Sequence, residues 1–139
     1  MTWFTWSLLA AAFAALTAIL AKAGLAGTNS NVATAIRTTV AMLLAWAIVA
    51  GTGVAPEVAR VPTRTLLVLA LSGLATGLSW LCYFQALQLG EASRVAPVDK
   101  LSVVLVIALA AIFLGEPVTI AKLIGGALIA AGAVILAVY

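Results

Sequence analysis

Histidine is absent from this chain of 139 residues, and cysteine occurs once, at Cys82. A single cysteine excludes a disulfide within the chain, and without histidine a metal ion would lack its usual nitrogen and sulfur ligands. No nucleophile is placed near a general base in the sequence pattern. We therefore expect a protein that is not an enzyme and that holds no metal ion or cofactor.

Charge is also scarce, because only 8% of the residues are charged whereas 65% are hydrophobic, and the mean hydropathy is +1.27. A water-soluble fold with this composition has too few polar groups to cover its surface. The net charge of +3 is not arranged as a basic stripe, so we expect no nucleic-acid binding. Basic residues near the ends of apolar segments instead predict contact with membrane lipid head groups.

Long apolar segments are what the chain does contain, and five of them reach spanning length. A hydrocarbon core of about 30 Å requires about 20 helical residues, at about 1.5 Å per residue. The segments are continuously apolar and lack the alternation of a barrel strand, which favours helices. We predict an all-α integral membrane bundle of five transmembrane helices in one domain, residues 1–139. The predicted spans are 3–25, 32–53, 65–89, 95–114 and 121–139.

The connections between these spans are short, so an odd number of spans places the two termini on opposite sides of the membrane. Ser30 or Asn31 is the expected N-cap of the second helix, and Pro56 and Pro62 interrupt any helix in the longest connection, residues 52–64. No basic residue precedes Lys22, so we do not expect the first span to be a cleaved signal. Lysine and arginine are divided almost evenly between the two faces, which leaves open one fixed orientation or insertion in both.

Four ionisable residues lie inside the predicted spans and near the same side of the membrane: Lys22, Arg37, Asp99 and Lys100. Each is about 5–9 Å from the nearest span end at helical rise. Intramembrane charges are costly and usually face a partner or a water-filled cavity, so this polar layer is a candidate substrate pathway or gate. Two alternatives remain: the lysines extend outward to the interface, or Arg37 and Asp99 form a structural ion pair.

The third span has a second group of polar and aromatic side chains. Trp80 and Tyr83 share one side of a helix and predict a cavity wall, while Gln85 and Gln88 form an i, i+3 pair. Interfacial anchoring is the alternative for the two aromatic residues.

Pro97 lies at the predicted start of the fourth span. It is either an ordinary first-turn proline or the mark of a broken helix entry beside Asp99.

Small residues indicate where membrane helices can approach closely, either within one chain or between two chains. We predict helix packing or dimer contacts at Gly73, Gly77, Gly125, Gly126, Ala130 and Gly132.

Three stretches together resemble a known family: residues 80–102 (WLCYFQALQLGEASRVAPVDKLS), 113–117 (FLGEP) and 124–132 (IGGALIAAG). They are similar to the EamA family of the drug/metabolite transporter superfamily, and Arg37 falls where that family often has an arginine early in its second helix. Members usually carry ten helices as two inverted five-helix repeats, and this chain resembles one repeat.

The resemblance implies a secondary transporter of small metabolites or amphipathic compounds in the cytoplasmic membrane. A single repeat needs a second copy, so we expect a homodimer, antiparallel or pseudo-symmetric, that works by alternating access. Unlike the related small multidrug resistance proteins, the first span has no acidic residue, which leaves Asp99 as the candidate for proton coupling. A non-transporting subunit of a larger complex is the alternative function.

Overall fold

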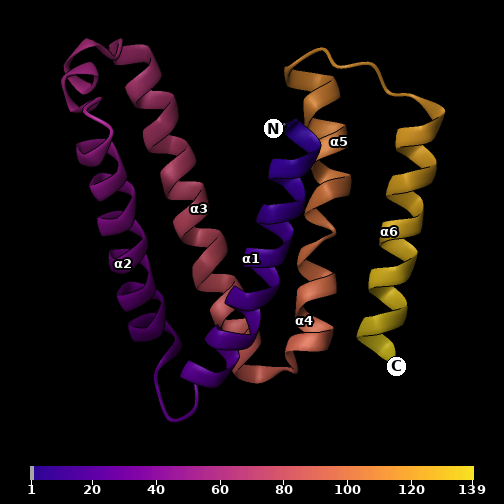
Figure 1. The fold of residues 1–139 in the computed structure, drawn as a ribbon. Helices are drawn as coiled ribbons and strands as arrows, with labels where there is room; N and C mark the ends of the chain where they lie inside the picture. The colour runs from indigo at the N-terminus through magenta and orange to yellow at the C-terminus, as the bar shows by residue number, and fades with distance from the viewer. Residues whose placement is uncertain (1) are drawn as a thin grey trace. The chain divides into compact units, whose positions relative to one another are not determined.

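The computed structural model describes residues 2–139, and the described chain is helical without a strand (Figure 1). The elements are α1 (Trp3–Gly24), α2 (Ser30–Gly51), the 3-10 helix η1 (Ala55–Arg60), α3 (Thr63–Leu89), α4 (Ala92–Asp99), α5 (Ser102–Phe113) and α6 (Ile120–Val138). Helices α4 and α5 share one apolar segment, Ala92–Phe113, so the described chain has five spans long and apolar enough to cross a membrane. The predicted all-α fold with five spans is confirmed.

Helix α2 begins earlier than the sequence predicts. Asn29 has an extended backbone and its side-chain oxygen accepts a hydrogen bond from the Asn31 N–H at 2.9 Å. Asn29 is therefore the N-cap, and the prediction of Ser30 or Asn31 was wrong. Ser30 is the first helical residue, which leaves its hydroxyl available for a contact outside the helix.

The connection between α2 and α3 contains η1, which has Pro56 in its first turn. Proline is tolerated there because the first N–H groups of a helix have no partner within that helix. The predicted interruption between the second and third spans is confirmed, because no α-helix covers residues 52–62.

The fourth span is broken after Asp99, and Pro97 lies inside α4 rather than in its first turn. Helix α4 begins at Ala92, three residues before the predicted start of the fourth span at residue 95. Pro97 has no N–H to donate, and the chain after it tightens: Lys100 N–H donates to the Pro97 carbonyl and Leu101 N–H to the Val98 carbonyl, both at 3.0 Å. These are bonds of the 3-10 type, which separate α4 from α5.

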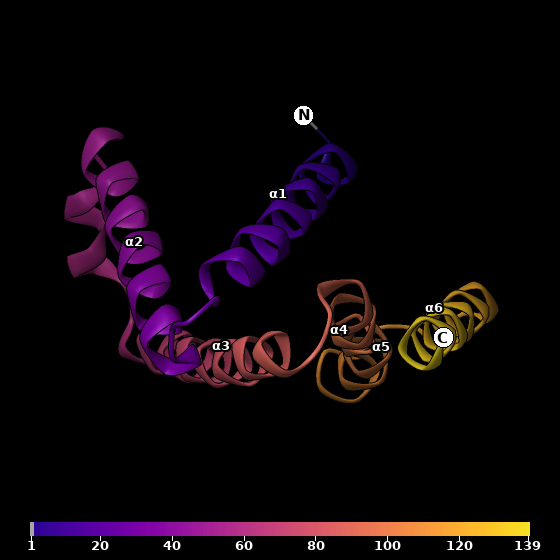
Figure 2. The same ribbon diagram turned by 90° about the horizontal axis from the view of Figure 1, so that it is seen from below.

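The chain divides into two compact units. The first unit, Met1–Lys22 with Leu89–Tyr139, contains most of α1 together with α4, α5 and α6. Within it, α6 packs along both α4 and α5 (Figure 2). The single-domain assignment for residues 1–139 stays a prediction.

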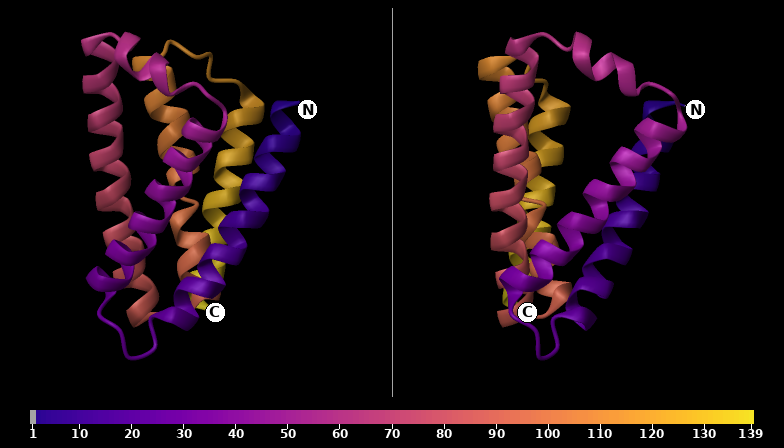
Figure 3. Two further views of the ribbon diagram at one scale, coloured as in Figure 1. Left: turned by 60° about the vertical axis from the view of Figure 1, so that its left-hand side comes forward. Right: turned by 90° about the vertical axis from the view of Figure 1, so that its left-hand side faces the viewer.

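The second unit, Ala23–Gln88, contains α2, η1 and nearly all of α3. Helices α2 and α3 approach each other where α2 begins and α3 ends, and they separate toward η1 (Figure 3). The buried residues of these two helices, Ser30, Thr34, Phe84 and Leu87, all lie near the approaching ends. The packed part of this unit therefore lies at one end of the helix pair.

Candidate functional site

One face of α2 carries three polar side chains at successive turns, Ser30, Thr34 and Arg37. Their spacing places them on the same side of the helix. Ser30 and Thr34 are buried, and the Thr34 hydroxyl donates to the Ser30 carbonyl at 2.8 Å. The Thr34 hydroxyl is thus satisfied by its own helix, and Arg37 is the charged group of this face.

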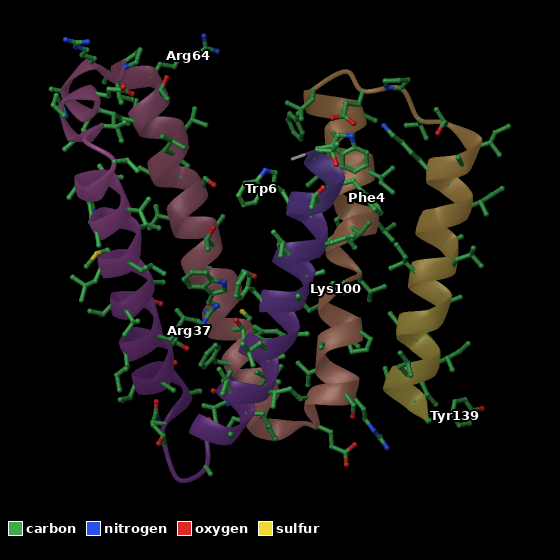
Figure 4. The ribbon with its side chains drawn as sticks, viewed as in Figure 1. Phe4, Trp6, Arg37, Arg64, Lys100 and Tyr139 are labelled. Atoms are coloured by element: carbon green, nitrogen blue, oxygen red, sulfur yellow. The ribbon has the colours of Figure 1, made fainter. Side chains whose placement is uncertain are left out.

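The Arg37 guanidinium lies against aromatic rings of α3 (Figure 4). Its central carbon is 4.3 Å from the centre of the Trp80 ring and 5.4 Å from that of Phe84. Trp80 and Phe84 are four residues apart and so project from the same side of α3. Cation–π attraction of this kind replaces part of the hydration that a charge loses inside a membrane.

Tyr83 extends this aromatic group. Its ring makes an edge contact with Phe84, with ring centres 6.5 Å apart, and it interacts electrostatically with Arg37. The sequence predicted that Trp80 and Tyr83 line a cavity wall. The contacts of Trp80 support the protein-facing alternative over interfacial anchoring.

Two hydrogen bonds join α3 to the chain at the start of α2. The Ser30 hydroxyl donates to the Gln85 side-chain oxygen at 2.6 Å, and the Gln88 amide donates to the Thr28 carbonyl at 3.1 Å. Each glutamine therefore bonds toward α2 rather than to the other glutamine. The two bonds fix α3 against the residues that precede and begin α2.

Arg37 has one buried nitrogen, Nη1, with no hydrogen-bond partner among the described residues. Three of the four acidic side chains of the chain are already paired elsewhere. The pairs are Glu91 with Arg94 at 3.4 Å, Asp99 with Lys100 at 3.0 Å, and Glu116 with Lys122 at 3.1 Å. The aromatic rings contact the flat face of the Arg37 guanidinium, and Nη1 has no hydrogen bond.

The other residues of the predicted polar layer belong to the first unit. The Lys22 ammonium donates to the Gly90 carbonyl at 2.7 Å, which ties the end of α1 to the connection before α4. Asp99 and Lys100 form their ion pair at the junction of α4 and α5, where Figure 4 labels Lys100. The break after Pro97 thus coincides with a pair of charges. A common layer with Arg37 stays a prediction.

The small residues of α6 divide into two groups. Gly126 is buried, and a Cβ built on it would lie 3.4 Å from Ile107 Cδ1 of α5. Gly126 and Ala130 also line an apolar groove of about 450 Å³ between α5 and α6. Gly125 and Gly132 have open space beside them, as do Gly73 and Gly77 of α3. Gly126 therefore packs within the chain, whereas the predicted dimer contacts at the other four glycines stay a prediction.

Sequence reasoning missed Ser30, Thr34 and Phe84 as members of the Arg37 site. The spacing of Ser30, Thr34 and Arg37 was a usable signal, but a second span that starts at residue 32 leaves Ser30 in a loop. Phe84 gave no separate signal, because an apolar aromatic residue in a membrane span is equally suited to face lipid.

The five spans, the broken fourth span and the intramembrane arginine define a multi-pass membrane protein with a polar site inside its spans. Residues 1–138 match the EamA-like transporter family, and the chain belongs to that family. A relative from a Sinorhizobium species, named as an uncharacterized transporter in the cobO 3′ region, is 56% identical over 138 residues. The match covers 99% of this chain and 98% of that relative. No solved structure matches the chain. The family and the relative together support a membrane transporter.

Proposed function

We propose that the chain is a secondary transporter of small metabolites or amphipathic compounds in the cytoplasmic membrane. The observation that carries this proposal is the Arg37 site, a cation held on Trp80 and Phe84 inside a span. A charge that served only to hold helices together would be expected to bond fully to the protein. Arg37 instead keeps Nη1 unbonded beside aromatic side chains, as a ligand site requires.

Two copies form the working transporter in this proposal. At most 11% of the residues in an 18-residue apolar window of any span are buried, so the spans keep apolar surface for lipid or for a second chain. Gly125 and Gly132 are seven residues apart and lie on one face of α6 with open space beside them. This face permits close backbone approach between two helices, and we assign the homodimer contact to it.

Alternating access follows from two such subunits inserted in opposite orientations. The inward-open and outward-open arrangements are then nearly equal in energy, and bound substrate shifts their populations. The break between α4 and α5 supplies the movable element, because its 3-10 bonds join two short helices in place of one rigid helix. Asp99 and Lys100 lie at this break and act as the gate.

A ligand screen followed by flux measurement tests the function. Compounds that bind only the folded protein raise its apparent stability by RT ln(1 + [L]/Kd), so a thermal-stabilisation screen identifies candidates. Each stabilising compound is then offered to liposomes that contain only this chain. We expect uptake above that of protein-free liposomes for at least one compound, and a loss of uptake in Trp80→Leu.

Phe113→Leu is a matched control, because Phe113 is an exposed aromatic at the end of α5 outside the Arg37 site. It should leave uptake unchanged. Uptake is measured with each compound added to the liposomes and again after fusion of oppositely loaded vesicles. A protein that binds stabilising compounds but transports none of them in either assay would be a non-transporting subunit, and the proposed function would be wrong.

A further inference from the structure

We infer that the ligand of the Arg37 site is an organic anion, a molecule that joins a carboxylate or phosphate to an apolar body. The inference rests on the proposed function, because it names the substrate class of that same site. Like other arginine side chains in proteins, that of Arg37 stays protonated and carries hydrogen-bond donors but no acceptor.

The position of Arg37 makes the missing partner costly. It is the eighth residue of α2, about 10 Å from the helix start at about 1.5 Å per residue. Its ring contacts stabilise the face of the guanidinium but form no hydrogen bond, and Nη1 remains buried and unbonded in the described structure. An oxyanion supplies both the missing acceptor and the missing opposite charge.

The acidic side chains of the described chain are not paired with Arg37. Glu91, Asp99 and Glu116 each have a lysine or arginine partner of their own. Glu57, in η1, belongs to the connection beyond the far end of α2. The Gln85 side-chain oxygen accepts a hydrogen bond from Ser30 at 2.6 Å. The ion pairs of the described chain thus leave Arg37 without an acidic partner, and in this proposal the ligand supplies the opposite charge.

The surroundings of Arg37 specify the rest of the ligand. Trp80, Tyr83 and Phe84 present rings beside the guanidinium, so an apolar or aromatic body attached to the anion has a surface on which to pack. A planar guanidinium can bind a carboxylate or phosphate through two N–H groups at once, which a lysine cannot do. The site therefore favours an oxyanion with a ring or short apolar chain over a cation or a neutral sugar.

Phenyl phosphate is a suitable probe, because it joins a phosphate to a single ring. We expect saturable binding of phenyl phosphate to the full chain in phosphatidylcholine nanodiscs, and no binding of benzyltrimethylammonium, which has a similar ring and the opposite charge. Arg37→Gln should lower the affinity by about 10- to 100-fold, the range expected for a lost charged hydrogen bond. Arg37→Lys keeps the charge but loses the contact through two N–H groups, so its affinity should lie between those of the wild type and Arg37→Gln.

Arg64→Gln is the matched control, since Arg64 is an exposed arginine at the opposite end of α3 (Figure 4). It should bind phenyl phosphate like the wild type. Trp80→Leu keeps the charge of Arg37 but removes a ring, so it should weaken the binding of phenyl phosphate more than that of inorganic phosphate. This second variant tests the site even if Arg37→Gln fails to fold.

A lipid head group has the same phosphate chemistry as a soluble ligand, and a second arm separates the two sources. Replacing a third of the phosphatidylcholine by phosphatidylglycerol should leave the Kd for phenyl phosphate within about twofold. Abolition of binding by phosphatidylglycerol would assign Arg37 to a lipid and overturn the inference. Equal binding by wild type and Arg37→Gln, or binding of the cation as tightly as the anion, would also overturn it. Binding is measured without transport, so a failure of flux alone contradicts the proposed function and leaves the anion site standing.

Discussion

The Ser30 hydroxyl and the Gln85 side-chain oxygen are 2.6 Å apart, and this contact helps to hold Trp80 and Phe84 of α3 beside Arg37. Trp80 and Phe84 reach Arg37 only if the two helices keep their register at this end. A hydrogen bond between side chains of membrane helices contributes about 0.6 kcal/mol on average and about 1.7 kcal/mol at most. Ser30 and Gln85 are therefore positioning residues, whose weak individual contributions fix the geometry around a charge.

A double-mutant cycle measures this contact. Ser30→Ala and Gln85→Leu should each destabilise the protein, and their effects should be non-additive by about 0.5–1.5 kcal/mol because either change alone removes the bond. The measurement is reversible unfolding in mixed micelles. Thr39→Ala is the control, because the exposed Thr39 hydroxyl bonds only to the Ala35 carbonyl of its own helix. Additivity within about 0.3 kcal/mol would show that the contact does not couple α2 to α3.

How far the site is readable from the sequence differs from residue to residue. The arginine itself is readable, because a charge in an apolar segment requires a partner or a function. Its ring partners are only partly readable: Trp80 is suggested by its depth, but Phe84 becomes a partner through the way α2 meets α3. The alternative ion pair between Arg37 and Asp99 was equally consistent with depth, and depth alone does not show which side chains meet.

At the scale of elements, the fourth span shows what proline does inside a membrane helix. Pro97 removes one N–H, and the following residues form 3-10 bonds that separate α4 from α5 beside the Asp99–Lys100 pair. The length and hydropathy of this segment predict one uninterrupted span. The break was readable only as one of two alternatives, because proline is also common in the first turn of an ordinary helix.

Pro97→Ala should restore the missing N–H and join α4 to α5. We expect the variant to be more stable by about 1–3 kcal/mol, because a proline inside a helix costs about 3 kcal/mol or more in a fully regular helix. It should also slow transport, since the movable element becomes rigid. Unfolding in mixed micelles and uptake by liposomes measure the two effects. Pro117→Ala, in the connection between α5 and α6, should alter neither, and a faster Pro97→Ala transporter would remove the break from the mechanism.

Substitutions at Gly125 and Gly126 test subunit association and subunit stability separately. Gly126→Leu overpacks the contact with Ile107 and should destabilise the subunit by about 1–3 kcal/mol. Gly125→Leu points into open space, so it should change subunit stability by less than about 0.5 kcal/mol but weaken the dimer. Cross-linking yield at several protein-to-lipid ratios measures association. A Gly125→Leu protein that cross-links like the wild type would place the dimer contact on another helix.

At the scale of the whole molecule, five spans determine the topology. Within the first unit, the N-terminal end of α1 and the C-terminal end of α6 lie at opposite ends (Figure 1). The number and class of the spans were readable from composition and segment length, because the bilayer fixes both. The oligomeric state was not, because small-residue faces pack helices within a chain and between chains equally well, as Gly126 illustrates.

Accessibility labelling tests the topology. Single cysteines introduced at Thr2 and Tyr139, in a chain that carries Cys82→Ala, should react with a membrane-impermeant reagent from opposite sides in each orientation. If the near balance of lysine and arginine allows dual insertion, both sites are half-labelled in sealed vesicles. Three lysines added to the 52–62 connection should then favour one orientation, so that each site is labelled either almost completely or hardly at all. Labelling of both termini from one side would require an even number of spans and contradict the fold.

Uptake of labelled phenyl phosphate into phosphatidylcholine liposomes that contain only this chain tests the central claim most directly. That claim is that Arg37, held on Trp80 and Phe84, binds the substrate of a self-sufficient membrane transporter. We expect uptake above that of protein-free liposomes for the wild type and for Arg64→Gln, and uptake at the protein-free level for Arg37→Gln. Equal uptake by the wild type and Arg37→Gln would contradict it.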